Sequence, residues 1–446
     1  MAIARGIRRG RRASKKIEPQ LEVWVEIDGT LISAGSLALH EDAGQFYASF
    51  TYHSSYLDLA RVGKAFSLDP LNLPLQTESI ESESRYFKLG ALFDAAPDAW
   101  GRTVMASDEG ISSASLTEST VLLKGRGSGV GAILFAKPGD HIDRPDETNL
   151  PSIDHIDKLY RTITAIESGV QVDERLREML MSSWDMGGAR PKAVVLDNQG
   201  AEWIVKFPRA IDTYSRQRNE WANLEMARAI GLRVPTLQRV ELEGGDCALL
   251  IRRFDRGEPG QMKRQHYLSA VSLISPPPDF DKRQMDSDYG ASIFSYARIA
   301  DVVRAISSNV EADLQELFAR MVLNILLHNT DDHLKNTGFL MDLSHPGFRY
   351  RLSPLFDVVT QEGTLKHMLH IGPGVDGVGA AGGRIGTLEN ARAGALHWGL
   401  TNSQVDSIIE KVSSVTEQRR KFYVTSGMSD DEIKLVERQI RPDSKK

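Results

Sequence analysis

The sequence predicts an α+β protein with two lobes, and three observations support this fold class. Strand-like alternation of apolar and polar residues dominates the first half of the chain, whereas helical spacing dominates after residue 256. A lysine, Lys206, stands near the end of an apolar strand in the first half. Asp331, Asn336 and Asp357 follow in that order in the helical half.

Length and composition are those of an ordinary globular protein. The 446 residues suffice for two or three domains. A net charge of −6 argues against a protein that coats nucleic acid. The single cysteine, Cys247, excludes internal disulfides and Cys-rich zinc sites, which fits a cytoplasmic location. No apolar run approaches the roughly 18–20 residues of a membrane span, so we expect no membrane contact.

Residues 1–19 are predicted to form a disordered basic arm. Arginines and lysines fall among glycine, alanine and serine there, and such a segment cannot bury apolar surface. Two interpretations remain open: a solvated tail, or an arm that contacts DNA or another acidic partner. The arm lacks the apolar stretch of a secretory signal.

Residues 20–148 are predicted to form a small α/β subdomain. The expected strands are residues 21–27, 31–37, 44–51 and 132–135. Asp28-Gly29 indicates a hairpin turn after the first strand. Residues 86–106 have helical character that is interrupted around Pro97. The glycine-rich run 125–131 is out of register with a dinucleotide-binding fingerprint, so we interpret it as a turn.

Residues 149–256 are predicted to form a small lobe built around a hairpin. The expected strands are residues 193–196, 202–207 and 247–251, and the expected helices are 153–168, 172–183 and 219–231. Gly231 and Pro235 mark the end of the last helix.

Residues 257–446 are predicted to form a helical large lobe. The expected helices are residues 297–307, 311–328, 404–412 and 430–439, with a strand-like stretch at 348–352. Strands first and helices later, with nucleotide-binding chemistry between them, is the plan of a two-lobed protein-kinase-like fold.

The order Asp331, Asn336, Asp357 suits phosphoryl transfer. One carboxylate orients the attacking hydroxyl, while a carboxamide and a second carboxylate hold magnesium on the phosphates through oxygen ligands. We therefore expect Asp331 to be the base and Asn336 and Asp357 to be metal ligands. Asp332 is a rival base, but its spacing to Asn336 is one residue short. Lys335 could neutralise the transferred phosphoryl group.

Another use of the same loop is a zinc site, which the residue types His328, Asp331, Asp332 and His333 suggest. That interpretation leaves Lys206 and Asp357 without a role. Within the phosphoryl-transfer interpretation, His333 packs and forms hydrogen bonds beside the nucleotide.

Lys206 and Glu220 are candidates for the phosphate side of the site. A lysine at the end of this strand would contact the α and β phosphates, and a glutamate opening the next helix could pair with it. The alternatives are a strand lysine that snorkels to solvent and a glutamate favoured by the helix dipole.

Two further segments are expected to touch the nucleotide. The turn before the small-lobe hairpin contains Gly187, Gly188, Ala189, Arg190 and Lys192. Consecutive glycines let backbone N–H groups approach phosphate oxygens, although a plain glycine turn is the alternative. Arg253 and Phe254 follow the strand at 247–251, where the lobes should join and adenine would meet the backbone. We interpret Asp255 as an ion-pair partner.

Together these residues resemble the HipA-type toxin kinases of bacterial toxin–antitoxin modules. The matching pieces are GARPK at 188–192, IVKFP at 204–208, NE at 219–220, RFDR at 253–256, TDDHLKN at 330–336 and PLFD at 354–357. LDPLNLPL at 68–75, FDAAPD at 93–98 and LKGRGSGVGA at 123–132 resemble the family's N-terminal subdomain. The likeness covers nearly everything from about residue 20 to residue 430.

The resemblance implies a cytoplasmic serine/threonine protein kinase that uses ATP and Mg²⁺. Residue by residue, it implies Asp331 as the base, Asn336 and Asp357 as Mg²⁺ ligands and Lys206 as the phosphate-binding lysine. It also implies a HipB-type helix-turn-helix antitoxin that binds operator DNA with the kinase attached. The implied protein substrate is a translation component such as an aminoacyl-tRNA synthetase, and the implied outcome is growth arrest and persistence.

One departure from the family concerns self-phosphorylation. Family members often carry a self-phosphorylated serine ahead of the glycine loop, whereas this chain has Asp185. Either Ser182 or Ser183 takes that role from a shifted register, or this route of autoinhibition is missing. A fixed carboxylate could partly mimic a phosphate. Our hypothesis is a kinase that lacks the usual self-silencing step.

Two other functions compete with this interpretation. A small-molecule kinase of the aminoglycoside or choline type shares the Asp, Asn, Asp order, although the β-rich N-terminal region argues against it. The second competing function is a non-catalytic corepressor that is bound to a DNA-binding antitoxin. The basic arm is compatible with a direct contact between such a protein and DNA. The intact set of Lys206, Asp331, Asn336 and Asp357 argues against a degenerate kinase.

Overall fold

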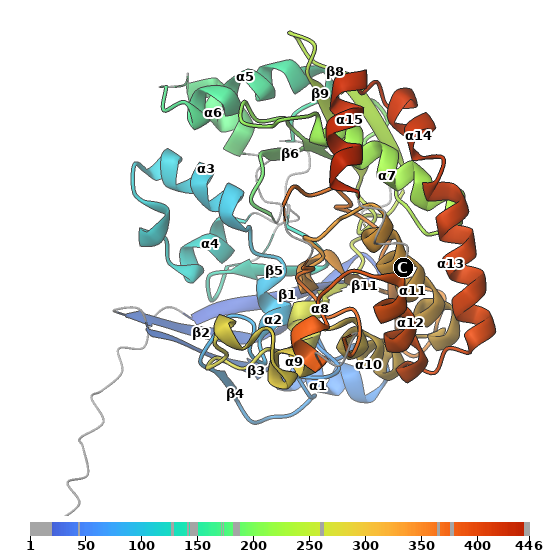
Figure 1. The fold of residues 1–446 in the computed structure, drawn as a ribbon. Helices are drawn as coiled ribbons and strands as arrows, with labels where there is room; N and C mark the ends of the chain where they lie inside the picture. The colour runs from blue at the N-terminus through green and yellow to red at the C-terminus, as the bar shows by residue number, and fades with distance from the viewer. Residues whose placement is uncertain are drawn as a thin grey trace, which may run out of the picture.

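The computed structural model describes residues 20–42, 45–125, 129–140, 142, 150–170, 172, 174–181, 188–258, 263–363, 366–374 and 379–440. The predictions for the basic arm, Ser182, Ser183, Asp185 and Gly187 lie outside these ranges. Within them, three antiparallel sheets and the helices between them surround one continuous hydrophobic core (Figure 1). This mixture of helices and antiparallel sheets confirms the predicted α+β class.

The N-terminal sheet has the strand order β4-β3-β2-β1-β5. Its strands are β1 (Gln20–Ile27), β2 (Thr30–Asp42), β3 (Gln45–Tyr52), β4 (Ile80–Ser82) and β5 (Ile133–Ala136). The predicted turn is present, because Asp28 and Gly29 have φ angles of 49° and 80°. A two-residue hairpin of type I′ needs positive φ at both positions. Alternation along β1 buries Leu21, Val23 and Val25 completely.

The helices of this region are α1 (Ser54–Arg61), α2 (Gly90–Phe93), α3 (Ala99–Glu109) and α4 (Glu118–Lys124). The interrupted helix predicted over 86–106 is therefore two helices, with residues 94–98 between them. Pro97 causes the break, because it has no N–H to donate and disfavours helical angles at the residue before it. Asp98 takes extended backbone angles at the start of α3.

The small-lobe sheet has the strand order β6-β7-β9-β8. Its strands are β6 (Lys192–Leu196), β7 (Glu202–Lys206), β8 (Leu237–Glu241) and β9 (Cys247–Arg252), and its helices are α5 (Ile156–Glu167), α6 (Glu174–Met181) and α7 (Arg216–Ile230). Gly231 ends α7 with a φ of 91°, as predicted. Strand β8 was not predicted, because only Leu237 and Val240 are apolar in it and neither is fully buried.

The large-lobe helices are α8 (Ala270–Ile274), α9 (Asp288–Ile293), α10 (Tyr296–Ile306), α11 (Val310–Leu326), α12 (Leu388–His397), α13 (Asn402–Thr416), α14 (Arg419–Thr425) and α15 (Asp430–Gln439). The four predicted helices correspond to α10, α11, α13 and α15. Helix α12 escaped prediction because its buried face holds Ala391, Gly394 and Ala395 rather than large apolar residues. In the described ranges no helix is both long and apolar enough to traverse a bilayer.

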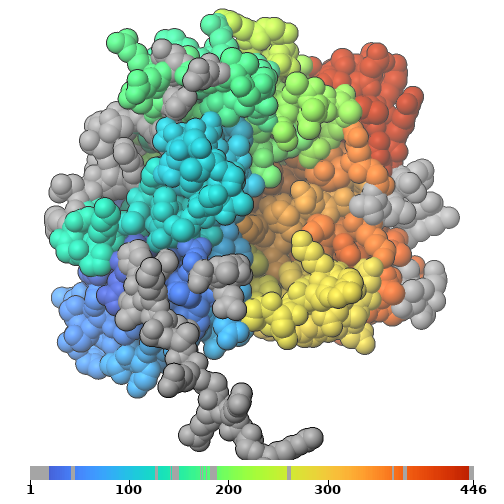
Figure 2. All heavy atoms as spheres, turned by 90° about the vertical axis from the view of Figure 1, so that its left-hand side faces the viewer, coloured from blue at the N-terminus to red at the C-terminus, as the bar shows by residue number. Residues whose placement is uncertain are grey.

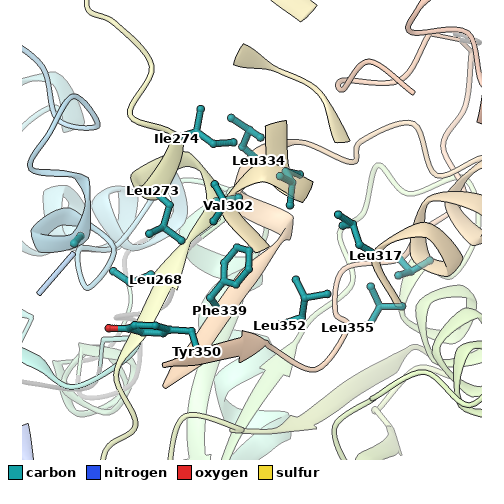
Figure 3. Packing of buried hydrophobic residues seen from close by; sticks show 14 of the residues in the cluster. Leu268, Leu273, Ile274, Val302, Leu317, Leu334, Phe339, Tyr350, Leu352 and Leu355 are labelled. Carbon is teal, nitrogen blue, oxygen red and sulfur yellow. The ribbon is translucent and has the colours of Figure 1, made fainter. Parts of the chain in front are cut away.

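The large lobe also contains a three-stranded sheet, of which the sequence predicted only the strand-like stretch at 348–352. Its strands are β10 (Tyr267–Ser269), β11 (Gly338–Met341) and β12 (Tyr350–Leu352), in the order β10-β11-β12. Strands this short carry no readable alternation. Figure 3 shows Leu268, Phe339 and Leu352, one from each strand, in the buried cluster with Val302 of α10 and Leu317 of α11.

Each sheet lies within one of the parts expected from the sequence. The N-terminal sheet falls within 20–148, the small-lobe sheet within 149–256 and the third sheet within 257–446. We therefore propose to retain this division as the domain organisation.

Candidate active site

A cavity of about 550 Å³ lies between the three parts of the chain. Its described walls include these predicted site residues: Gly188, Ala189, Arg190, Lys192, Lys206, Glu220, Phe254, Asp331, His333, Lys335, Asn336 and Asp357. The molecular face in Figure 2 is hollowed between the N-terminal region, in blue and cyan, and the large lobe, in yellow and orange. The residues that line this cavity are up to 275 positions apart in the sequence, from Tyr86 to Gln361.

Lys206 lies among the acidic residues of the cavity. It ends β7, and its Nζ lies 2.7 and 2.9 Å from the two carboxylate oxygens of Glu220 on α7. The same nitrogen lies 2.8 Å from Oδ1 of Asp357. Burial lowers the pKa of the Lys206 ammonium, but the two carboxylates outweigh burial and raise it above its usual value. The lysine therefore stays charged.

Helix α7 is fastened to the segment that carries Asp357. The Asn219 side chain accepts a hydrogen bond from the Thr360 N–H at 2.9 Å. The Asn223 side chain donates one to the Val358 carbonyl at 3.0 Å. Glu220 accepts from the Asp357 N–H at 3.0 Å. Asp357 has a φ of 61°, which costs a residue other than glycine roughly 1–3 kcal/mol. These buried hydrogen bonds hold that backbone conformation, which places the carboxylate against the lysine.

Asp331 belongs to the base loop, residues 328–337, which follows α11. Its side chain is 54% exposed, with Nε2 of His333 4.0 Å from its Oδ1. The Asn336 side-chain amide donates to the Asp331 carbonyl at 2.7 Å. Partial burial raises the pKa of the Asp331 carboxyl, and Asp357 raises it further. His333 acts in the opposite direction without cancelling the rise. A raised pKa suits a general base, because it brings the group closer to the operating pH.

Asp332, the rival base, is a buried structural residue. Only 4% of it is exposed. Its carboxylate accepts hydrogen bonds from the Tyr296 hydroxyl at 2.8 Å and the Met368 N–H at 2.9 Å, and it lies 2.9 Å from Nδ1 of His367. This carboxylate anchors the base loop and does not line the 550 Å³ cavity, whereas Asp331 does.

The described part of the glycine-rich segment, residues 188–192, borders the cavity. Gly188 has a φ of 107°, a backbone conformation that favours glycine, and a Cβ there would lie 2.2 Å from Nζ of Lys192, whose flexible end would have to move. Arg190 forms two hydrogen bonds with Asp212, at 2.8 and 3.0 Å. Burial lowers the pKa of the Lys192 ammonium to about 8, and Lys206 acts in the same direction. The segment therefore contributes the cationic side chains of Arg190 and Lys192 to this wall.

An apolar part of the cavity lies next to Phe254. The ring of Phe254 is 5.8 Å from that of Phe356, and the aliphatic side chains of Ile204 and Ile251 line the same space. Flat, apolar walls of this kind suit a purine ring.

Arg253 corrects one prediction, because it is not among the described residues that line the cavity. Its side chain has no exposure and pairs with Glu202 at 2.9 Å and Asp255 at 2.7 Å. The structure therefore gives Arg253 a buried ion-pairing role in place of a nucleotide contact, and it confirms Asp255 as an ion-pair partner.

Several polar cavity residues were not predicted from the sequence. Tyr86 and Asp98 come from the N-terminal region, and Arg216 of α7 donates to Gln361 at 3.1 Å. Pro97 and Asp98 stood out as a helix break and as part of the FDAAPD stretch at 93–98 that resembles the family. Neither signal carries information about contacts with residues far away in the sequence.

Asn336 and Asp357 fit a magnesium ion by chemistry. Magnesium prefers oxygen ligands and is usually held by one or two carboxylates together with substrate phosphates. Burial raises the pKa of Asp357, but Lys206 and Lys192 outweigh burial and hold it well below its usual range, so the carboxylate stays charged. Among the residues that the structure describes, no three His, Cys, Asp or Glu side chains gather as a metal site, so the alternative zinc site is not assembled.

Comparison with known proteins places the chain in a family. The sequence profile of the HipA-like C-terminal domain family matches residues 184–419, more than half of the 446-residue chain. "Putative kinase Y4dM" of Sinorhizobium fredii is 31% identical over 177 residues, which cover 37% of this chain and 38% of that protein. "Putative kinase" of Haemophilus influenzae is 29% identical over 168 residues, which cover 36% of this chain and 46% of that protein. The aligned part spans less than half the length of either relative.

A solved structure resembles the chain over nearly its whole length. A chain in the complex of Shewanella oneidensis MR-1 HipA, HipB and operator DNA aligns with 94% of each chain, with a TM-score of 0.66 and 20% identity. At this identity the likeness shows the fold, which is the two-lobed, HipA-like kinase arrangement with an N-terminal subdomain. By its sequence profile, the chain belongs to the family of proteins with a HipA-like C-terminal domain.

Proposed function

We propose that this chain is an ATP- and Mg²⁺-dependent serine/threonine protein kinase. One observation carries the proposal: Lys206, Glu220, Asp331, Asn336 and Asp357 line a single cavity, with the lysine bonded to both Glu220 and Asp357. This is the set of groups that positions a nucleotide, its metal and an attacking hydroxyl.

The proposed reaction assigns a task to each side chain. Lys206 binds the α and β phosphates, and the N–H groups of the glycine-rich segment cradle the phosphate oxygens. Asp331 accepts the proton of a substrate hydroxyl as its oxygen bonds to the γ-phosphorus and the bond to ADP breaks. Lys335 balances charge on the transferred group. Magnesium, held by Asn336 and Asp357, would supply positive charge beside the phosphates.

We further propose that the kinase is the cytoplasmic toxin of a toxin–antitoxin module. Family membership supports this, and the Shewanella protein of the same fold was solved with HipB and operator DNA. The proposed partner is a HipB-type helix-turn-helix antitoxin, through which the kinase would reach DNA. The proposed substrate is a translation component such as an aminoacyl-tRNA synthetase.

A transfer assay tests the enzymatic proposal. The protein is incubated with magnesium, a cell lysate and ATP labelled on its γ-phosphate, beside an Asp331→Asn variant. Label on polypeptides that depends on Asp331 supports the protein kinase. Label only on small molecules favours the aminoglycoside- or choline-type kinase, and no turnover favours the non-catalytic corepressor.

Nucleotide binding should take up protons near pH 8. Lys192, with a pKa of about 8, is half neutral there, and approaching phosphates favour its charged form. We therefore expect ATP to take up a fraction of a proton at pH 8 and little at pH 6, with affinity falling as pH rises through 8. Calorimetric titration in two buffers of different ionisation enthalpy measures the uptake.

The matched variants for this prediction are Lys192→Met and Lys158→Met. Lys158 is exposed on α5, so its loss should leave the uptake unchanged. Undiminished proton uptake in the Lys192→Met protein would show that another group titrates.

Self-phosphorylation on Ser182 or Ser183 is expected to be absent, because Asp185 occupies the place of the usual serine. Mass spectrometry after incubation with ATP and magnesium checks this expectation. An Asp185→Ser variant is expected to gain a phosphate. Stoichiometric phosphate on Ser182 or Ser183 of the native chain would refute the hypothesis.

A further inference from the structure

The N-terminal region forms one wall of the proposed active site. Its residues on the cavity include Tyr86, Phe93, Asp98 and Val130. All of them precede residue 184, where the match to the HipA-like C-terminal domain begins. The catalytic roles proposed above come entirely from the later residues, so the task of this wall needs its own explanation.

Asp98 is the residue of this wall that touches both sides of the cavity. Its Oδ2 accepts a hydrogen bond from the Gly188 N–H at 2.9 Å. Its Oδ1 accepts one from Nζ of Lys335, in the base loop. One carboxylate therefore bridges the glycine-rich segment of the small lobe and the base loop of the large lobe.

Neighbouring contacts strengthen the attachment on both sides. The Trp100 backbone N–H donates to the Gly188 carbonyl at 3.2 Å, and its indole N–H donates to the Lys192 carbonyl at 3.0 Å. Nζ of Lys335 lies 4.9 Å from the centre of the Tyr86 ring. The start of α3 thus holds the glycine-rich segment by three hydrogen bonds, and the Lys335 ammonium lies between a carboxylate and an aromatic face.

We propose that Asp98 is a positioning residue that clamps the glycine-rich segment and the base loop at a fixed separation across the cavity. The inference rests on the proposed kinase function and adds the N-terminal region to it. In the proposed kinase, the glycine-rich segment with Gly188 holds the nucleotide's phosphates. The base loop carries Lys335, which is adjacent to Asn336 and two residues after His333 in the sequence. The separation of the two segments therefore sets the distance between the γ-phosphate and the substrate hydroxyl whose proton Asp331 accepts.

The clamp can be removed with little harm to α3. Asp98 stands at the N-cap of α3, yet its side chain makes no capping hydrogen bond. An Asp98→Ala change therefore removes the bridge without removing a helix cap. Asp108→Asn, at an exposed position of the same helix, is the matched control. Asp98→Asn keeps the size of the side chain and serves if the alanine variant folds poorly.

The first readout is amide hydrogen exchange of the full chain, which needs no catalysis. Loss of the carboxylate acceptor should speed exchange of the Gly188 amide at least about tenfold, whereas Asp108→Asn should leave it unchanged. Unaltered exchange at Gly188 in the Asp98→Ala protein overturns the clamp. The amide of Asp98→Asn keeps an oxygen that can accept from the Gly188 N–H, so that variant is judged by kcat alone.

The second readout separates positioning from simple stabilisation. Misplacement of reacting groups should lower kcat roughly 10–100-fold while KM for ATP changes less than about threefold. Faster exchange with unchanged kcat overturns the positioning role. If the native chain transfers no phosphate at all, the proposed function fails, and the exchange result still decides whether Asp98 is a clamp.

Discussion

Replacing Asp331 with asparagine is expected to lower the rate of phosphoryl transfer roughly 10²–10⁴-fold, the usual contribution of a general base. An amide has the same shape but cannot accept the hydroxyl proton. Because the side chain is 54% exposed and lies 4.0 Å from Nε2 of His333, the fold should be unaffected. Initial rates measured with labelled ATP, together with melting temperatures, check both parts.

Asp332→Asn is the matched control for this prediction. Its carboxylate is buried and holds the Tyr296 hydroxyl and the Met368 N–H, so the change should cost about 1–3 kcal/mol of stability. We expect Asp331→Asn to lose rate without losing stability and Asp332→Asn to lose stability. This contrast would distinguish the two neighbours. A normal rate in the Asp331→Asn protein would contradict the assignment of the base.

Asp357→Asn should also abolish transfer, by a different physical route. The amide would remove the negative charge that attracts magnesium and would weaken the 2.8 Å ion pair with Lys206. Raising the magnesium concentration should therefore recover part of the activity of this variant and none of the activity of Asp331→Asn. Equal rates in the native and Asp357→Asn proteins would exclude a metal-binding role.

Replacing Asp255 with alanine is expected to give the largest loss of stability, about 3–5 kcal/mol, because it breaks a buried ion-pair network. Only 2% of Asp255 is exposed. Its carboxylate accepts from the Gly131 N–H at 2.8 Å, from Arg253 at 2.7 and 3.0 Å and from Arg256 at 2.8 Å. The change would leave the wholly buried Arg253 guanidinium partly uncompensated and would loosen the N-terminal region from the segment that follows β9.

Glu258→Ala is the control for this second prediction. Glu258 pairs with Arg252 at 2.7 Å, but the two side chains are 71% and 30% exposed. Solvent screens such a pair, so its loss should cost no more than about 1 kcal/mol. Urea unfolding of both variants measures the difference, and similar midpoints for the two would show that the buried network adds little.

The same network gives a pH dependence of defined sign. Burial raises the pKa of Asp255, but Arg253 and Arg256 outweigh burial and hold it well below its usual range. A lowered pKa in the folded state means that the stabilisation is complete above the unfolded value, near 3.9, and is lost as pH falls below it. The stability gap between native and Asp255→Ala proteins should therefore narrow below about pH 4.

Local patterns in the sequence were enough for much of the secondary structure. Helix α15 has the predicted bounds, and Gly231 ends α7 because a left-handed residue is needed there. Of the three-stranded sheet only the stretch at 348–352, which contains β12, was predicted. Strands β10 and β11 were missed because they lie about 70 residues apart and strands of three or four residues cannot display a period. The choice between Asp331 and Asp332 rested on spacing alone, since burial depends on Tyr296, His367 and Met368, which approach only in the folded chain.

By itself, the sequence determined the α+β class, the order of the lobes and the identities of the charged side chains that surround the cavity. Period, capping and residue chemistry are local properties, and a linear chain displays them directly. Only the tertiary structure decided that Arg253 is a buried ion-pairing residue and that Asp98 reaches Gly188 and Lys335. Those outcomes depend on packing between segments about 50 to 240 residues apart. A short stretch of sequence does not specify which distant segments will bury it.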